Sequence, residues 1–194
     1  MSSLSKKLEK RRQIAKSTCD LFIEEGFVNI SISQLAVKAG IGKGTIYEYF
    51  KNKEDVVFEL MSCLQDEYDP KLLENLENAK DSKEKIIYLF DIFLNDKEIV
   101  KKQKAIYKEF LAISLNNPTK EILTYQKNLK DKYIKMIITI FQEETNMSEE
   151  YISNLASSLY ATMNGFFITN EEKIVMLEYI NNIFEILKIK GEKI

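Results

Sequence analysis

Apolar residues recur every three to four positions along most of the chain, which is the period of amphipathic helices. The pattern predicts long helices at about Leu8–Glu25, Lys53–Tyr68, Ser82–Asn95, Asp96–Leu115, Pro118–Glu144, Ser148–Ile168 and Glu171–Lys190. The two prolines, Pro70 and Pro118, both fall near predicted helix boundaries. The sequence therefore predicts an all-α protein of about nine helices.

Two of these helices are short and lie between Ser31 and Phe50. Ser31 with Gln34 three positions later fits a capping box, and Gly40 suits the position after a helix end. One apolar face of the first short helix is made by Ile32, Leu35, Ala36 and Ala39. Ile46 and Phe50 give the second an inward face. Two short helices joined by a glycine turn predict a helix-turn-helix, whose second helix enters the major groove of DNA.

The runs IAKSTCDLFIEEGF, SISQLAVKAGIGKGTIYEYF and KNKEDV, between Ile14 and about Leu60, resemble the DNA-binding domain of the TetR family of bacterial transcriptional regulators. The chain departs from the family pattern at Gly42, where Ser or Thr is commoner. The resemblance implies a helix-turn-helix domain over residues 1–52 and a helical ligand-binding and dimerisation domain over residues 53–194. It implies DNA contacts by Lys43, Gly44, Thr45, Tyr47, Tyr49 and Lys53, with Ser31 and Ser33 contacting the DNA backbone.

The last two helices carry more apolar surface than one buried face requires. Ser157, Ala161 and Gly165 add a row of small residues at a spacing of four. Periodicity alone leaves open whether these helices are central within one protomer or pair with a second copy. The resemblance favours a homodimer, because TetR-like proteins pair through their last two long helices. The expected interface residues are Ser157, Ala161, Gly165, Ile180, Ile183 and Phe184.

Aromatic residues gather between residues 82 and 168, as in protein cores and in small-molecule pockets alike. Gln103 falls on an apolar stripe with Ile106 and Phe110, and a buried amide needs a hydrogen-bond partner. The resemblance favours a ligand pocket, with Gln103, Tyr107, Tyr160, Asn164 and Phe167 as its expected lining. No Arg or His falls in this region, so we expect a lipophilic effector, neutral or cationic, rather than a small anion.

Charge divides along the chain. Residues 1–53 carry ten basic and five acidic residues, a net of +5, and residues 54–194 carry 18 basic and 25 acidic, a net of −7. A basic N-terminal part is typical of a DNA-binding head. Its densest cluster is Lys6, Lys7, Lys10, Arg11 and Arg12. This cluster is either a phosphate-contacting arm or a solvated helix start.

The composition argues against an enzyme, because the chain has no His and only two Cys, Cys19 and Cys63. We expect no metal and no cofactor. The sequence shows no secretory signal and no apolar run near the ~18 residues of a membrane span, which favours a cytoplasmic protein without membrane contact. The preferred function is a repressor that a small effector releases from a palindromic double-stranded DNA operator. The alternative is a constitutive DNA-binding regulator that has no small-molecule effector.

Overall fold

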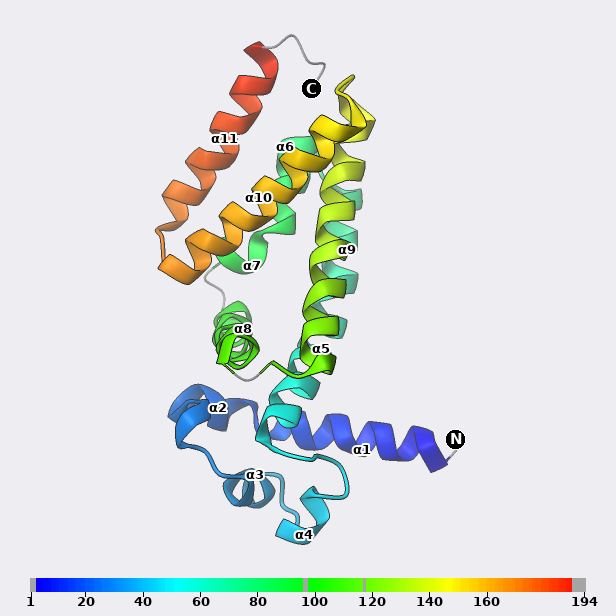
Figure 1. Ribbon diagram of the computed structural model, residues 1–194, viewed down its shortest axis with the longest axis vertical. Helices are drawn as coiled ribbons and strands as arrows, with labels where there is room; N and C mark the ends of the chain where they lie inside the picture. The colour runs from blue at the N-terminus through cyan, green and yellow to red at the C-terminus, as the bar shows by residue number, and fades with distance from the viewer. Residues whose placement is uncertain (1–2, 96–97, 117, 190–194) are drawn as a thin grey trace. The chain divides into compact units, whose positions relative to one another are not determined.

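The computed structural model describes residues 3–95, 98–116 and 118–189, and every regular element within these ranges is helical (Figure 1). The all-α prediction is thereby confirmed. The elements are α1 (Ser3–Ser17), α2 (Cys19–Glu25), the 3₁₀ turn η1 (Phe27–Asn29), α3 (Ile32–Lys38), α4 (Lys43–Ile46), α5 (Lys53–Glu77), α6 (Ser82–Leu89), α7 (Asp91–Leu94), α8 (Glu98–Asn116), α9 (Lys120–Glu144), α10 (Glu149–Thr169) and α11 (Lys173–Ile189). Within the described ranges, no helix combines the length and the apolar character needed to cross a membrane.

Two of the predicted helices are each divided in two. The helix expected over Leu8–Glu25 is interrupted at Thr18, whose hydroxyl donates to the Ala15 carbonyl at 2.7 Å. Bonds of this kind compete with the helical ladder. The helix expected over Ser82–Asn95 is interrupted at Phe90, which is buried and stacks on Phe93 with ring centroids 6.2 Å apart. We attribute the break at Phe90 to the burial of this aromatic pair. The periodicity of apolar residues does not predict such a break.

The prediction of a helix boundary near Pro70 was wrong, because α5 continues through Pro70 to Glu77. A proline inside a helix removes one backbone hydrogen bond and costs ~3 kcal/mol. Pro70 is exposed, so water can solvate the freed carbonyl group. Leu72, two residues later, is 1% exposed, and its burial offsets part of the cost. Packing of the final turns therefore overrides the local signal.

Other helix ends follow the sequence closely. The Asn52 side chain accepts a hydrogen bond from the Asp55 N–H at 2.9 Å, as expected of the residue that caps α5. Ser148 caps α10 by accepting from the Tyr151 N–H at 3.3 Å. Helix α9 begins at Lys120 rather than at Pro118, with Thr119 as the capping acceptor. The expected helix positions Asp96, Lys97 and Lys190 lie outside the described residues.

The chain forms two compact units that divide it differently from the predicted domains. The first unit combines Met1–Asp69 with Asp96–Ile122, and the second combines Pro70–Asn95 with Leu123–Ile194. In the first unit, α8 packs against α2, and the Lys102 ammonium lies 2.7 Å from the Asp20 carboxylate. That the DNA-binding function resides in residues 1–52 stays a prediction, since compactness does not test it.

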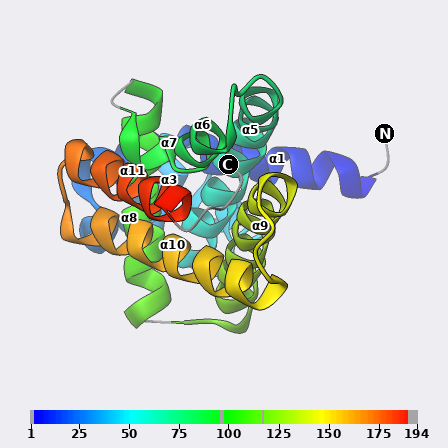
Figure 2. The same ribbon diagram turned by 90° about the horizontal axis from the view of Figure 1, so that it is seen from above.

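The second unit is held together by aromatic contacts between helices. Phe167 of α10 stacks on Phe93 of α7 at 4.8 Å, and Phe141 of α9 meets Phe184 of α11 at 5.8 Å. Helices α10 and α11 lie side by side and run in opposite directions (Figure 2). The Tyr179 hydroxyl donates to the Thr162 hydroxyl at 3.3 Å and joins this pair. Asn170 ends α10 in the left-handed conformation, with φ 59°.

Candidate nucleic-acid interface

The turn between α3 and α4 has the geometry that its sequence predicts. Ser31 and Gln34 form both halves of the capping box at the start of α3. Gly40 has φ +66°, and two backbone bonds close the end of α3 around it: Gly40 N–H to Val37 at 3.0 Å, and Ile41 N–H to Ala36 at 3.0 Å. These are the two bonds of a Schellman motif, which uses glycine because the left-handed conformation is strained for other residues. The turn fixes the direction in which α4 leaves.

We call Lys43–Phe50, which comprises α4 and the turns that follow it, the recognition segment. After Ile46 its backbone continues in tighter turns, with Glu48 N–H bonded to the Thr45 carbonyl at 3.1 Å and Tyr49 N–H to the Ile46 carbonyl at 3.1 Å. Ile46 and Phe50 are 0% and 1% exposed, which confirms the predicted inward face.

The other side of the recognition segment faces outward. Lys43, Gly44 and Tyr47 are exposed, and Thr45 and Tyr49 are half-buried. An added methyl group on Gly44 would meet no atom within 4 Å, so packing within the protein does not require glycine there. A polar and aromatic surface on a short rigid element is what contact with base edges and phosphates needs.

Lys53, predicted to contact DNA, has a different set of partners. Its ammonium group donates to the carbonyls of Phe27 at 2.8 Å, Ile30 at 3.1 Å and Val28 at 3.3 Å. It also lies 4.3 Å from the centre of the Phe27 ring, a cation–π contact. An ammonium group has three N–H donors, and all three are used here. Lys53 therefore fixes the η1 turn, and with it the entry into α3, to the first turn of α5.

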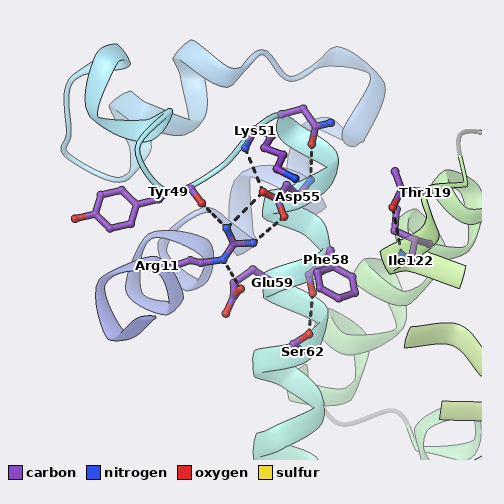
Figure 3. A network of polar contacts seen from close by, with 10 residues as sticks. Arg11, Tyr49, Lys51, Asp55, Phe58, Glu59, Ser62, Thr119 and Ile122 are labelled. Atoms are coloured by element: carbon purple, nitrogen blue, oxygen red, sulfur yellow. Dashed lines mark hydrogen bonds and ion pairs between the residues drawn. The ribbon is translucent and has the colours of Figure 1, made fainter. Parts of the chain in front are cut away.

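Arg11 is the centre of a polar network that links three elements (Figure 3). Its guanidinium bonds the Asp55 carboxylate at 2.7 Å and the Glu59 carboxylate at 2.5 Å, both on α5. It also donates to the Tyr49 carbonyl and covers the Phe50 ring, 4.3 Å from its centre. Asp55 in turn accepts from the Lys51 N–H at 3.1 Å. Arg11 thus joins α1 to the end of the recognition segment and to the first two turns of α5.

The electrostatics of Arg11 follow from this position. Partial burial alone would lower the pKa of its guanidinium, but the hydrogen bonds that it donates to the Asp55 and Glu59 carboxylates raise that pKa above the usual value. Arg11 is therefore a permanent cation whose donors point into the protein. This role was not predictable from sequence, because Arg11 stands in the run of basic residues predicted as a phosphate-contacting arm or a solvated helix start.

Two further cations on α1 are also paired within the chain. Arg12 lies 2.7 Å from the Asp66 carboxylate, and the Lys16 ammonium pairs with Glu67. Lys6, Lys7 and Lys10 are exposed and precede these pairs. Of the five residues in the basic cluster, these three lysines are exposed, whereas Arg11 and Arg12 pair with carboxylates of α5.

Ser31 and Ser33, the expected DNA-backbone contacts, differ in their surroundings. The Ser31 hydroxyl donates to the Gln34 side-chain oxygen at 2.7 Å and accepts from the Gln34 N–H at 3.3 Å. Its single proton is therefore engaged in capping α3. Ser33 is half-buried. Their contact with DNA stays a prediction.

The five expected ligand-binding residues are divided between the two units. Gln103 and Tyr107 are buried in the first unit, where Tyr107 stacks on Phe110 with centroids 6.4 Å apart. Tyr160, Asn164 and Phe167 belong to the second, where Tyr160 meets Tyr133 at 6.3 Å. The Asn164 amide donates to the Tyr160 carbonyl of its own helix at 2.9 Å, so it has a partner within the protein. A shared pocket stays a prediction.

The expected dimer residues differ in exposure. Ser157 and Ala161 are exposed, and Gly165 and Ile183 are half-buried. Ile180 and Phe184 are 0% and 2% exposed within the protomer, where Phe184 packs on Phe141. These two side chains belong to the core of the second unit and are not available to a partner. The apolar residues that α11 does expose include Ile174 and Ile186, at 54% and 53%.

The two thiols are shielded from solvent to different degrees. Cys63 is buried in α5 and Cys19 is half-buried in α2. Burial raises the pKa of both thiols, with a smaller contribution from Asp20 at Cys19. The neutral thiol is therefore the dominant form at pH 7, as expected of residues that serve as small apolar side chains.

The sequence around the helix-turn-helix is similar to that of known transcriptional regulators. Residues 14–60 match the family model of bacterial regulatory proteins of the tetR family. The fatty acid metabolism regulator protein of Bacillus subtilis is 31% identical over 83 residues, 43% of this chain and 43% of its own length. The HTH-type transcriptional regulator HbdR of Aromatoleum is 30% identical over 80 residues, 41% of this chain and 35% of that protein. The match thus spans less than half the length of these relatives.

Solved structures extend the likeness to the whole fold. A transcriptional regulator from Saccharomonospora viridis, in complex with choline, superposes with a TM-score of 0.74 at 20% identity, covering 91% of this chain and 96% of that one. FadR from Bacillus subtilis, in complex with stearoyl-CoA, gives a TM-score of 0.60 at 19% identity and covers 90% and 96%. At these identities the comparison establishes the fold, a helix-turn-helix head with a larger helical part.

Proposed function

The chain belongs to the TetR family of bacterial transcriptional regulators, and from this premise we propose that it is a repressor that a small effector releases from a palindromic operator. The family is non-enzymatic, which agrees with the prediction made from a chain without histidine.

The observation that carries the proposal is the two-sided recognition segment. Its inward face is fully buried, and its outward face presents Lys43, Gly44 and Tyr47 to solvent. Lys43 would neutralise a phosphate, Tyr47 would contact a base edge or the backbone, and Gly44 would let the DNA approach the helix closely. Thr45 and Tyr49, half-buried beside them, would contribute at the edges of the same surface.

Two copies are needed to read a palindrome. We propose that α10 and α11 pair with those of a second protomer, through the row of Ser157, Ala161 and Gly165. An added methyl group on Gly165 would meet no atom within 4 Å, so the protomer leaves space there for close approach of another helix. The two recognition segments would then enter successive major grooves about 34–36 Å apart on undistorted DNA.

Effector response would pass through α5. Its first turns carry Asp55 and Glu59, which hold Arg11, and its last turns belong to the second unit. A ligand that contacts the last turns would act on the same continuous helix that anchors the recognition segment. It can shift the protein only by binding the DNA-free state more tightly than the DNA-bound one. Relatives in this fold bind choline and stearoyl-CoA, which supports a small effector for this chain.

The constitutive alternative is favoured by one observation. The stacking of Phe167 on Phe93, and of Tyr107 on Phe110, is what a closed aromatic core would show. A regulator without an effector would hold its operator under all ligand conditions, so the two candidates differ in a measurable way.

The direct test is a gel shift with the DNA upstream of the chain's own gene, or with a duplex that the wild-type protein selects from a random pool. We expect sequence-specific binding by the purified protein. Release of that duplex by a small molecule would favour the repressor with an effector. Failure of the folded protein to select any sequence would contradict both candidates.

A further inference from the structure

The second unit contains an open groove of about 580 Å³ between the last turns of α5, helix α6 and one stripe of α9. This volume is within the range of small-molecule sites. None of the five ligand residues expected from sequence lines it. The groove lies wholly within residues of the second unit.

The floor of the groove is apolar. Its apolar lining comes from Leu73 and Leu76 of α5 and from Met136 and Ile140 of α9. Leu73 is 50% exposed, and Leu76 and Met136 are half-buried. Apolar surface left in water is unfavourable in proportion to its area, so an apolar occupant would be stabilised here.

The rim of the groove is cationic at one end. Lys132 and Lys135 line it one turn apart on α9. Toward the other end of α9, the Lys85 ammonium lies 3.0 Å from the Glu143 carboxylate, and the Ser82 hydroxyl donates to the Ile140 carbonyl at 3.5 Å. The Lys85–Glu143 pair cancels its own charge. Against the two α9 lysines stands one more carboxylate, Glu77, so the lining carries a net positive charge.

The stripe of α9 therefore has an order along its axis. Lys132 and Lys135 come first, Met136 and Ile140 follow, and Glu143 ends it. Lys132 and Glu143 are eleven positions apart along the helix, which is about 16 Å at 1.5 Å per residue. The order matches a molecule with an anionic head and a straight apolar tail: the head at the lysines, the tail along the floor.

We propose that the α5–α6–α9 groove binds a single-chain amphiphile with an anionic head group, such as a medium- to long-chain carboxylate. Lys132 and Lys135 hold the head group, and Leu73, Leu76, Met136 and Ile140 contact the chain. The lysines change the ligand class from the neutral or cationic lipophile expected from sequence to an anionic one. That the ligand acts as the effector rests on the proposed function, because α5 carries both the groove and the anchor of Arg11.

Calorimetric titration of the full chain with three probes tests the ligand class. Decanoate should bind saturably at one site per protomer. Octanoate, two methylenes shorter, should bind about fifteenfold more weakly, since each buried methylene changes affinity about fourfold. Decyltrimethylammonium has the same chain with the opposite charge and should bind at least tenfold more weakly than decanoate. Equal or tighter binding of the cation, or no saturable binding of decanoate, would overturn the proposal.

Matched variants locate the site. Lys135→Glu should weaken decanoate binding by about tenfold, whereas Lys130→Glu, the same charge change at an exposed position of α9 outside the groove, should leave it nearly unchanged. Thr139→Trp places a large ring on the groove wall and should abolish binding. Asn128→Trp is its control on the same helix. Because the chain has no other Trp, fluorescence of Thr139→Trp also verifies that this variant is folded.

A gel shift with and without decanoate distinguishes binding at the groove from an effect of that binding on the protein–DNA complex. Release of the wild-type protein from its duplex, and retention of Thr139→Trp, would support both the groove and the proposed function. Saturable binding without release would keep the groove and contradict its role as the effector site. Equal loss of affinity in Lys135→Glu and Lys130→Glu would show a general charge effect and overturn the groove as the binding site.

Discussion

At the residue scale, two cations close to the helix-turn-helix show why residue type alone does not assign a DNA contact. Lys53 and Arg11 both belong to basic segments, yet both donate to acceptors within the first unit. Lys43, by contrast, is exposed on the outward side of the recognition segment. The difference lies in which acceptors the fold brings within reach, and it gives each residue a distinct expected phenotype.

Tyr47→Ala should abolish sequence-specific binding and leave stability nearly unchanged. The side chain is 52% exposed and points away from the Ile46 and Phe50 face, so its removal takes little from the core. Loss of a base contact typically costs ~1–3 kcal/mol of discrimination. Gel shifts and thermal unfolding of the same preparation check both points. A folded variant with wild-type affinity would remove Tyr47 from the interface.

Lys53→Ala should lower specific affinity without changing its dependence on salt. The ammonium group holds the η1 turn through three carbonyls. We therefore expect its removal to displace α3, and not to remove a contact with a DNA phosphate. Lys43→Ala is the matched control, and it should reduce the slope of log K against log salt by ~0.9, the contribution of one neutralised phosphate. An equal reduction of the slope in Lys53→Ala would show that Lys53 contacts a phosphate, in keeping with the DNA contact that the resemblance implies.

Arg11→Gln should loosen the recognition segment while leaving it folded. The lost hydrogen bonds to Asp55 and Glu59 would destabilise the first unit by ~1–2 kcal/mol, since bonds to charged groups contribute about this much at partly exposed sites. Specific binding should fall, with non-specific binding and the salt slope unchanged. Arg12→Gln, which removes an exposed pair with Asp66, controls for the charge and should have little effect.

An unfolded fraction would have a different signature from a misplaced recognition segment. It would lower specific and non-specific binding of Arg11→Gln by the same factor. Arg11→Lys, which keeps the charge but not the planar fork of donors, should recover only part of the specific affinity. Full recovery by lysine would mean that charge alone is needed at this position.

At the element scale, α10 and α11 carry apolar residues both on their buried side and on their exposed side. Their inward residues, Ile180 and Phe184 among them, complete the core of the second unit, and their outward residues include Ala161, Ile174 and Ile186. The two helices therefore have apolar residues on two sides, which explains why their sequences carry more apolar surface than one buried face requires. Only burial within the protomer shows which side is already used.

Gly165→Glu should convert the proposed dimer to monomers without unfolding the protomer. The space around Gly165 can hold a side chain in one copy, but a charge in a helix–helix contact would lose its hydration. Sedimentation at several concentrations measures the change, with Asn128→Glu on α9 as the control. We expect the wild-type interface to bury at least the standard ~1,600 Å². A monomeric wild type would contradict both the dimer and the palindromic operator.

At the scale of the whole molecule, the charge division acquires a structural explanation. The net +5 of residues 1–53 includes Arg11, Arg12 and Lys16, whose partners on α5 come from the acidic remainder. Part of the positive charge is therefore neutralised within the first unit. Outside these pairs, the exposed cations of residues 1–53 are Lys6, Lys7 and Lys10 on α1, Lys43 in the recognition segment, and Lys38 and Lys51.

A two-fold symmetric footprint is the expected result for the intact protein on its operator. Protection should appear in two half-sites about one helical turn apart, because a symmetric dimer presents two equivalent recognition segments. Hydroxyl-radical footprinting measures the spacing. A single protected half-site at saturating protein would show that one protomer suffices and would contradict the proposed mechanism.

The sequence by itself determined the helical class, the helix-turn-helix and the family. These depend on short-range information: the period of apolar residues, the capping pair Ser31 and Gln34, and the left-handed turn at Gly40. Each acts over a few residues, so it can be read from neighbouring positions. The inward role of Ile46 and Phe50 was predictable for the same reason.

Only the tertiary structure decided the rest. The course of α5 through Pro70, the partners of Arg11 and Lys53, the burial of Ile180 and Phe184, and the groove beside Lys135 all depend on residues far apart in sequence. Arg11 meets Asp55 and Glu59 across more than forty positions. Whether a cation is available to DNA, or an apolar face to a partner, depends on what the fold has already placed beside it.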